Sequence, residues 1–316
     1  MKTRQNKENV RQLGGEQSFI NHFKNHYMLY LFLAPAVLLV FIFSYLPMTG
    51  LVIAFQDFDV FKGLFGSEWV GFENIRSIFE TPMFLRSISN TLQLSVLTLL
   101  VSFPFPVIFA LLLNEIKVSF FKRTFQTISY LPYFLSWIAV VGLTYSMTSV
   151  YGVINDIMEM ICGNGYERVM FLSKQELFVP MVLFLSVWKS FGWDSIIYLS
   201  AITSIDQQLY EAAEVDGANK WQQTIHVTLP GIIPTAVIVL IFNLGNLFKS
   251  NFELIYGLQN PFIDYDVIST VIYKSGIQNG DYAMSTAMGF IEGIVAFVLV
   301  LMANKISKKA SGTALW

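Results

Sequence analysis

Residues 211–230 read EAAEVDGANKWQQTIHVTLP, a polar stretch between two long apolar runs. The chain around it has 316 residues, of which 54% are hydrophobic and only 13% are charged. Because a soluble domain averages about 25% charged residues, this composition favours a protein that lies in a lipid bilayer. The polar stretch is therefore expected to be a loop outside the bilayer, and its side of the membrane has to be determined.

Six hydrophobic runs are long enough to cross a hydrocarbon core, which needs roughly 20 residues. They are Tyr27–Met48, Ser89–Leu113, Phe125–Met147, Leu177–Ala201, Ile232–Phe248 and Ala283–Ala303. The first run follows a basic segment, but it is too long for a signal peptide and shows no small-residue cleavage pattern. The sequence therefore predicts an all-α membrane protein with six transmembrane helices.

The basic residues indicate the orientation. With the N-terminus in the cytoplasm, twelve of the 20 Lys and Arg residues fall on cytoplasmic segments and seven on outer segments. This bias agrees with the positive-inside rule. Both termini and the loop 202–231, which contains the opening stretch, are therefore predicted to be cytoplasmic.

Three segments outside this loop also have a predicted local structure. The outer segment 49–86 is too long for a tight turn and is expected to pack as a small cap. Pro104 and Pro106 remove backbone donors and should kink the second span. In the second outer loop, Val153, Ile157, Met160 and Ile161 have helical spacing and predict a short interfacial helix that ends at Gly163-Asn164-Gly165.

The polar loop itself reads as two short helices. Ser204 is a candidate N-cap with Gln207 as its capping-box partner, and Asp206 lies in the first turn, where a carboxylate favours the helix dipole. Ile205, Leu209, Ala212 and Ala213 share one face. Gly217 is placed to end this helix in the left-handed conformation. A second helix is expected from about Asn219 to Pro230.

The spacing of this loop resembles the EAA loop of permease subunits in binding-protein-dependent (type I) ABC importers of bacterial inner (plasma) membranes. The matching residues are Glu211, Ala212, Ala213, Asp216, Gly217, Ala218, Val227, Leu229 and Pro230. The resemblance runs from about residue 30 to the C-terminus. The stretches LFLAPAVLLVFIFSYLPM and WVGFENI resemble the carbohydrate branch, and more narrowly the alginate-type permeases for complex oligo- and polysaccharides.

The resemblance implies a division of the chain into four parts. These are a cytoplasmic tail (1–26), the first helix with its outer loop (27–86), a five-helix permease core (87–304) that contains the coupling loop, and a second cytoplasmic tail (305–316). In the family, the loop helix docks on a pair of cytosolic ATPases. This implies coupling roles for Leu209, Glu211, Ala212, Ala213, Asp216 and Gly217.

The implied partners are a second homologous permease that forms a heterodimer with this chain, an ATPase dimer, an extracytoplasmic solute-binding protein, a saccharide and the bilayer. The chain has no G-x-x-x-x-G-K-[ST] loop, so ATP and Mg²⁺ are expected on the ATPase subunits, with no cofactor on this chain and no nucleic-acid partner. One cysteine and three scattered histidines form no metal-ligand set and no catalytic pair. The chain is thus predicted to be a transport subunit and not an enzyme.

Polar residues within the spans that flank the loop are candidates for a substrate pathway, because charges at membrane depth normally face a cavity or a partner. The candidates are Ser186, Lys189, Trp193, Asp194, Asn243 and Asn246. Lys189 would favour an anionic saccharide, but Asp194 could neutralise it. Alternatively, Lys189 and Asp194 pair structurally, and the Asn residues join helices.

Other classes of function are still open at this point. The permease could carry a non-sugar solute. An ion-coupled secondary transporter would instead show inverted repeats and broken helices in both halves, which the sequence lacks. An exporter half would commonly continue into its own ATPase, and an intramembrane enzyme would need a catalytic pair, whereas no histidine lies inside a predicted span.

Overall fold

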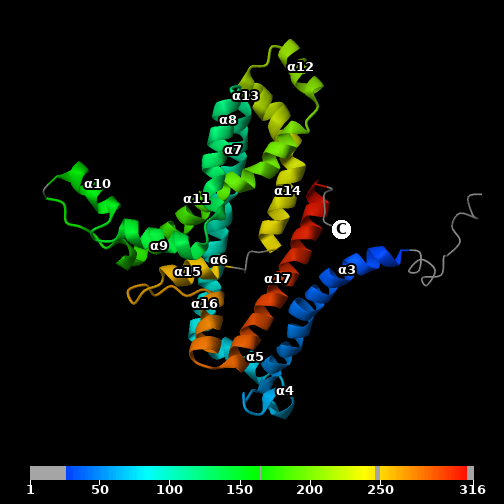
Figure 1. Ribbon diagram of the computed structural model, residues 1–316, viewed down its shortest axis with the longest axis vertical. Coiled ribbons are helices and arrows are strands. Elements are labelled where there is room, and N and C mark those ends of the chain that lie inside the picture. The colour runs from blue at the N-terminus through cyan, green and yellow to red at the C-terminus, as the bar shows by residue number, and fades with distance from the viewer. Residues whose placement is uncertain (1–25, 164, 246–249, 312–316) are drawn as a thin grey trace, which may run out of the picture.

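Long helices that run between the two ends of the molecule form its body, and α12 lies at one of these ends (Figure 1). The computed structural model describes residues 26–311 except residue 164 and residues 246–249. Most of the predicted first tail (1–26) and residues 312–316 of the predicted second tail (305–316) lie outside the described residues, and α17 extends to Ser311, into the second tail.

The first half of the described chain has the following elements. They are α3 (Tyr27–Val40), η1 (Phe41–Tyr45), η2 (Leu46–Phe55), β1 (Gln56–Asp57), α4 (Gly63–Gly66), β2 (Glu68–Trp69), α5 (Glu73–Glu80), α6 (Pro82–Ser102), α7 (Pro104–Glu115), α8 (Ser119–Tyr130), η3 (Leu131–Phe134) and α9 (Trp137–Thr148).

The second half continues with further helices. They are α10 (Val153–Cys162), η4 (Phe171–Ser173), α11 (Gln175–Thr203), α12 (Gln207–Val215), α13 (Lys220–Gln223), η5 (Thr224–Thr228), α14 (Leu229–Gly245), α15 (Phe252–Leu258), α16 (Ile268–Tyr273), η6 (Lys274–Gln278) and α17 (Tyr282–Ser311).

Five stretches of the described residues are long and apolar enough to cross a membrane. They are Tyr27–Phe55, Pro82–Glu115, Trp137–Cys162, Lys220–Gly245 and Tyr282–Lys305. The fourth predicted span lies inside α11, a 29-residue helix that is less apolar because polar and charged side chains interrupt it. The helical multi-pass architecture is therefore confirmed, whereas the count of six spans and the orientation of the termini stay predictions.

The third predicted span, Phe125–Met147, is not one continuous helix. α8 ends at Tyr130, a short 3₁₀ turn follows, and α9 begins at Trp137. Ser136 caps α9, because its Oγ accepts a hydrogen bond from the Ala139 amide at 3.2 Å. The chain is therefore broken within this hydrophobic run, and hydropathy alone does not reveal the break.

Prolines have different effects in the two places where they were expected to disturb a helix. The second span breaks at Phe103 between α6 and α7, as Pro104 and Pro106 predict. The expected end at Pro230 is wrong, because α14 continues through it. The π-helical η5 directly precedes α14, and a widened turn accommodates a residue that has no N–H and whose ring crowds the preceding carbonyls.

The first outer segment forms the predicted small cap. Strands β1 and β2 pair antiparallel, with Gln56 opposite Trp69. Phe55 stacks on Trp69 at a centroid distance of 5.7 Å and makes edge contacts with Phe72 and with Phe290 of α17. These aromatic contacts fix the cap to the end of α17.

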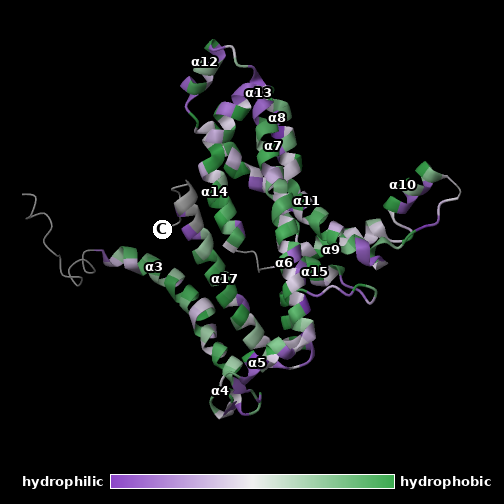
Figure 2. Ribbon diagram, turned by 180° about the vertical axis from the view of Figure 1, so that it is seen from behind, coloured by the Kyte–Doolittle hydropathy of each residue, from purple (hydrophilic) through white to green (hydrophobic). Residues whose placement is uncertain are grey.

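Apolar side chains cover much of the outside of the molecule, as a lipid environment requires. Helix α3 has no buried residue, and Phe32 is 78% exposed. Figure 2 shows α3, α14 and α17 as predominantly hydrophobic, and hydrophilic residues are more frequent around α12–α13 and α4–α5. Internal packing is concentrated where α11 contacts α6, α7 and α14, where α9 contacts α15, and where α17 contacts η2, α5 and α16.

Candidate coupling helix and translocation cavity

Helix α12 lies at the tip of the molecule (Figure 1). Its N-cap is Asp206, whose Oδ1 accepts from the Gln208 amide at 3.0 Å. The prediction of Ser204 as the N-cap is wrong. Ser204 ends α11, and its Oγ donates to the Ala201 carbonyl at 2.7 Å, so this hydroxyl is engaged with the preceding helix.

Gly217 ends the helix as predicted. Its φ of +81° lies in the left-handed region that favours glycine. The Ala218 amide donates to the Ala213 carbonyl at 2.9 Å, and the Gly217 amide donates to the Glu214 carbonyl at 3.0 Å. This pair of bonds is the Schellman arrangement, which satisfies the last carbonyls of the helix.

The hairpin formed by α12 and α13 is held together by bonds that the sequence did not indicate. Asn219 and Gln222 form a capping box at the start of α13. The Tyr210 hydroxyl lies 2.9 Å from the Thr228 hydroxyl, and Gln223 Nε2 donates to the Ala218 carbonyl at 3.2 Å. The first helix is therefore fixed to the base of α14.

The residues with predicted coupling roles lie on or beside α12, a helix without buried residues. Leu209, Glu211, Ala212, Asp216 and Gly217 are exposed, and Ala213 is half-buried. Leu209 is 54% exposed and Val215 88%, which is a large apolar exposure for a polar hairpin. A rigid hairpin with a small-residue and apolar surface is suited to contact another protein.

A cavity of about 870 Å³ lies among α6, α7, α9, α11, α14 and α15. Four predicted pathway residues line it, namely Ser186, Trp193, Asp194 and Asn243. Further lining residues with hydrogen-bonding or aromatic side chains are Ser95, Thr98, Ser102, Phe103, Trp137, Ser190, Tyr198, Ser200, Ser250 and Asn251. Hydroxyls on α6 do not stand out from the sequence, because serine and threonine are common at helix–helix contacts.

Asp194 is the charged side chain among the described residues that line the cavity. Ser190, one turn earlier on α11, lies near its carboxylate and also lines the cavity. Trp193 stacks on Tyr133 with ring centroids 4.7 Å apart and planes 7° apart, and Phe134 meets its edge. The turn between α8 and α9 thus orients the indole at the cavity.

Lys189 does not line the cavity. Its Nζ donates to the Tyr133 carbonyl at 2.7 Å and lies 5.1 Å and 4.9 Å from the ring centroids of Tyr133 and Trp137. The ammonium is thus held by a carbonyl and two aromatic faces. The ion pairs of the described residues do not include a Lys189–Asp194 pair. Asn246 lies outside the described residues.

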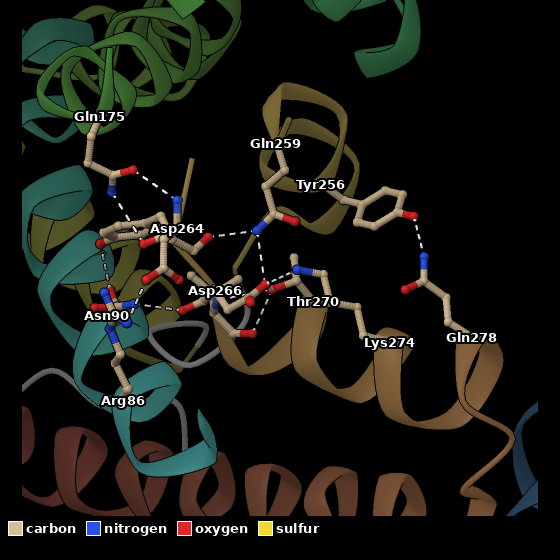
Figure 3. A network of polar contacts seen from close by, with 12 residues as sticks. Arg86, Asn90, Gln175, Tyr256, Gln259, Asp264, Asp266, Thr270, Lys274 and Gln278 are labelled. Atoms are coloured by element: carbon tan, nitrogen blue, oxygen red, sulfur yellow. Dashed lines mark hydrogen bonds and ion pairs between the residues drawn. The ribbon is translucent and has the colours of Figure 1, made fainter. Parts of the chain in front are cut away.

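A polar network joins α6 and the start of α11 to the segment between α15 and α16 (Figure 3). Arg86 pairs with Asp264 at 2.8 Å, and Gln175 bonds to the backbone of Asp264 through its Oε1 and Nε2. Asn90 donates to the Asp266 carbonyl at 2.8 Å. The same segment follows α15, whose Ile255 lines the cavity.

Asp266 is the most heavily bonded carboxylate of this network. Its Oδ1 accepts from Lys274 Nζ at 2.6 Å, from Thr270 Oγ1 at 2.8 Å and from Gln259 Nε2 at 3.0 Å. Burial raises the pKa of Asp266, whereas the bonds from Lys274, Thr270 and Gln259 lower it. The lowering is larger in total, so the pKa of Asp266 lies below its ordinary value.

A multi-pass helical protein with an internal cavity and one exposed helical hairpin has the architecture of a membrane transport permease. Residues 102–310 match the family of binding-protein-dependent transport system inner membrane components. The chain belongs to this family.

Relatives and solved structures agree with this assignment. The polygalacturonan/rhamnogalacturonan transport system permease YteP of Bacillus subtilis is 41% identical over 283 residues, which cover 89% of this chain and 88% of YteP. A chain of a bacterial ABC transporter for import of the acidic polysaccharide alginate superposes with a TM-score of 0.85 at 39% identity, covering 93% of this chain and all of that chain. A second structure, of the alginate transporter with a pentasaccharide-bound periplasmic protein, covers 95% of this chain at the same TM-score and identity.

Proposed function

We propose that this chain forms part of the pathway through which an ATP-driven importer moves an oligosaccharide or polysaccharide into the cell. The observation that carries the proposal is the cavity, where Trp137 and Trp193 lie beside hydroxyl and amide side chains. A sugar offers apolar C–H faces to aromatic rings and hydroxyl groups to such polar side chains. Permeases named for polygalacturonan and alginate transport are 41% and 39% identical to this chain and support a saccharide as solute.

The proposed assembly contains an extracytoplasmic binding protein, a second homologous permease and two ATPase subunits. The binding protein delivers the saccharide, and the two permeases enclose it between them. ATP and Mg²⁺ bind the ATPase subunits, and this chain supplies no catalytic residue and binds no cofactor. A solved alginate transporter holds a saccharide-bound periplasmic protein, which supports the first of these partners.

Energy from ATP would reach the cavity through α12. Its exposed Leu209, Glu211 and Ala212 would contact the ATPase pair, with Ala213, Asp216 and Gly217 shaping the end of the helix. The Tyr210–Thr228 bond and the continuous α13–α14 segment connect this contact to Asn243 in the cavity wall. A movement of α12 would therefore change the position of α14.

The solute is tested by uptake into vesicles that contain the assembled transporter. The cognate binding protein would be loaded in turn with neutral and acidic oligosaccharides of matched length and with a non-sugar solute. Saccharide uptake that requires both ATP and the binding protein is expected. Uptake of non-sugar solutes alone would contradict the proposal, as would uptake driven by an ion gradient without ATP.

The role of the cavity is tested by Trp193→Ala, with Ile138→Ala as the control. Both remove a large side chain, but Trp193 lines the cavity whereas Ile138 is 75% exposed on the outside of α9. Saccharide uptake should fall several-fold for Trp193→Ala at equal protein level and stay near the wild-type rate for Ile138→Ala. Equal uptake rates in the two variants would remove the support for a saccharide contact.

A further inference from the structure

One face of helix α10 is apolar and stays exposed, because no other part of the described chain covers it. Val153, Ile157 and Ile161 follow one another at four-residue spacing and are 53%, 51% and 74% exposed. Met160 beside them is 87% exposed. Such a run of large apolar side chains on one helix indicates an interaction surface.

The opposite face of α10 is fixed to the following segment of the chain. Arg168 Nη2 pairs with Asp156 at 2.9 Å and with Glu159 at 2.6 Å, so the two carboxylates of the helix share one cation. Asn155 is fully buried, donates to the carbonyls of Ser149 and Val169, and accepts from the Val169 amide. The rotation of α10 about its own axis is therefore set by these bonds, and the apolar face points away from them.

The apolar face of α10 continues the lipid-facing surface of α9. Ile138, Leu143 and Met147 of α9 are 75%, 47% and 39% exposed and belong to the same apolar stretch, Trp137–Cys162. Only residues 149–152 separate the two helices. Tyr151 in this turn is 87% exposed, and Arg168 lies 5.9 Å from its ring centroid. Tyrosines with a nearby cation are typical of the level of the lipid headgroups.

We propose that α10 lies in the headgroup region of the bilayer surface opposite α12, with Val153, Ile157, Met160 and Ile161 inserted among the acyl chains. A helix with one apolar face and one polar face binds in this way, parallel to the surface. The pairing with Arg168 cancels one of the two negative charges of Asp156 and Glu159, which reduces the repulsion between the polar face and anionic lipids. The anchored segment leads through η4 into the start of α11, and it would hold this end of the cavity wall at a fixed depth.

The depth of α10 can be measured with a nitroxide spin label. Cys162 is the single cysteine of the chain, so its replacement by serine gives a cysteine-free background. The label would be placed by Ile161→Cys, and separately by Ile157→Cys as a second site on the same face. The full-length chain would be purified in its transporter complex and reconstituted in bilayers of phosphatidylethanolamine and phosphatidylglycerol. Collisions with oxygen, which concentrates in the bilayer, are compared with collisions with a water-soluble nickel chelate.

The matched control is Glu167→Cys, an exposed position in the segment behind the polar face of α10. The ratio of oxygen to nickel collisions should be several-fold higher at positions 161 and 157 than at position 167. Equal ratios at all three positions would overturn the proposal. It would also be overturned if saturating loaded binding protein immobilised the label at position 161, because α10 would then be a docking surface for that protein.

Discussion

Gly192 sets the distance between α11 and α8. A Cβ at this position would overlap the backbone carbonyl group of Ser129, and a backbone group cannot turn aside as a long side chain can. The two helices therefore touch through their backbones, at the residue before Trp193. The sequence marks this glycine only as one of 20, because close approach depends on a partner helix more than 60 residues away.

Gly192→Ala should destabilise the protein by about 1–3 kcal/mol, the usual cost of overpacking a filled site. Gly142→Ala on α9 is the matched control, because nothing lies within 4 Å of the place that an added Cβ would take and alanine favours a helix. Thermal unfolding of the two purified variants would measure the difference. An equal midpoint for both variants would show that the α8–α11 contact is not tight.

Asp266 should make the stability of the network in Figure 3 depend on pH. Because its pKa is lowered in the folded protein, its ionised form stabilises the fold above the unfolded pKa of about 3.9. That stabilisation is lost as the pH falls through the folded pKa. Asp266→Asn should therefore lower the unfolding temperature at pH 7, and the difference from wild type should shrink in acid.

Asp264→Asn is the control for this pH dependence. The Asp264 side chain is 76% exposed, so its ion pair with Arg86 should contribute little to the stability of the fold. Unfolding temperatures of wild type and both variants would be recorded from pH 7 to about pH 2, so that the range covers the lowered pKa. A difference between wild type and Asp266→Asn that stays constant over this range would contradict the role of the carboxylate charge.

Single residues differ in how well the sequence predicts their place. Gly217 could be placed correctly because the left-handed helix end is a local requirement. Ser204 could not, because Asp206 lies only two residues further on and can cap the same helix, and the Ser204 hydroxyl is already bonded to α11. The position of Lys189 could not be predicted either, because its ammonium binds the Tyr133 carbonyl in the turn between α8 and α9. This turn lies far away in the sequence and comes close to Lys189 only in the folded protein.

At the level of elements, the α12–α13 hairpin depends on the bond between Tyr210 and Thr228. Tyr210→Phe and Thr228→Val each remove one partner, and a bond of this kind contributes about 0.5–1.5 kcal/mol. Amide hydrogen exchange of α12 should be faster in each single variant. The double variant should exchange little faster than either single variant, because both lose the same bond. Additive effects would show that the bond does not hold the hairpin.

The elements also show where periodicity is a sufficient guide and where it is not. Runs of apolar residues predicted most of the long helices, and Val153–Cys162 was predicted from its helical spacing. The break at 131–136 and the continuation through Pro230 were missed. The Ser136 cap begins a new helix after the break, and the π-helical turn allows the helix to continue through Pro230. Neither feature changes the mean hydropathy of the sequence.

In the whole molecule, the proposed role of α12 is to couple ATP hydrolysis on partner subunits to movement of a saccharide through the cavity. This coupling is tested by comparing vesicles that contain the wild-type transporter with vesicles that contain the Gly217→Pro variant. The quantity measured is the binding-protein-dependent uptake of a labelled oligosaccharide. Proline cannot adopt the φ of +81° at this position, so the end of α12 must change. Gln208→Ala, an exposed position outside the predicted coupling residues, is the control.

We expect ATP-dependent uptake for the wild type and for Gln208→Ala. We expect no uptake for Gly217→Pro, although the variant chain is still present in the membrane with its partner subunits. Normal uptake by Gly217→Pro, or wild-type uptake that needs neither ATP nor the binding protein, would contradict the coupling role of α12.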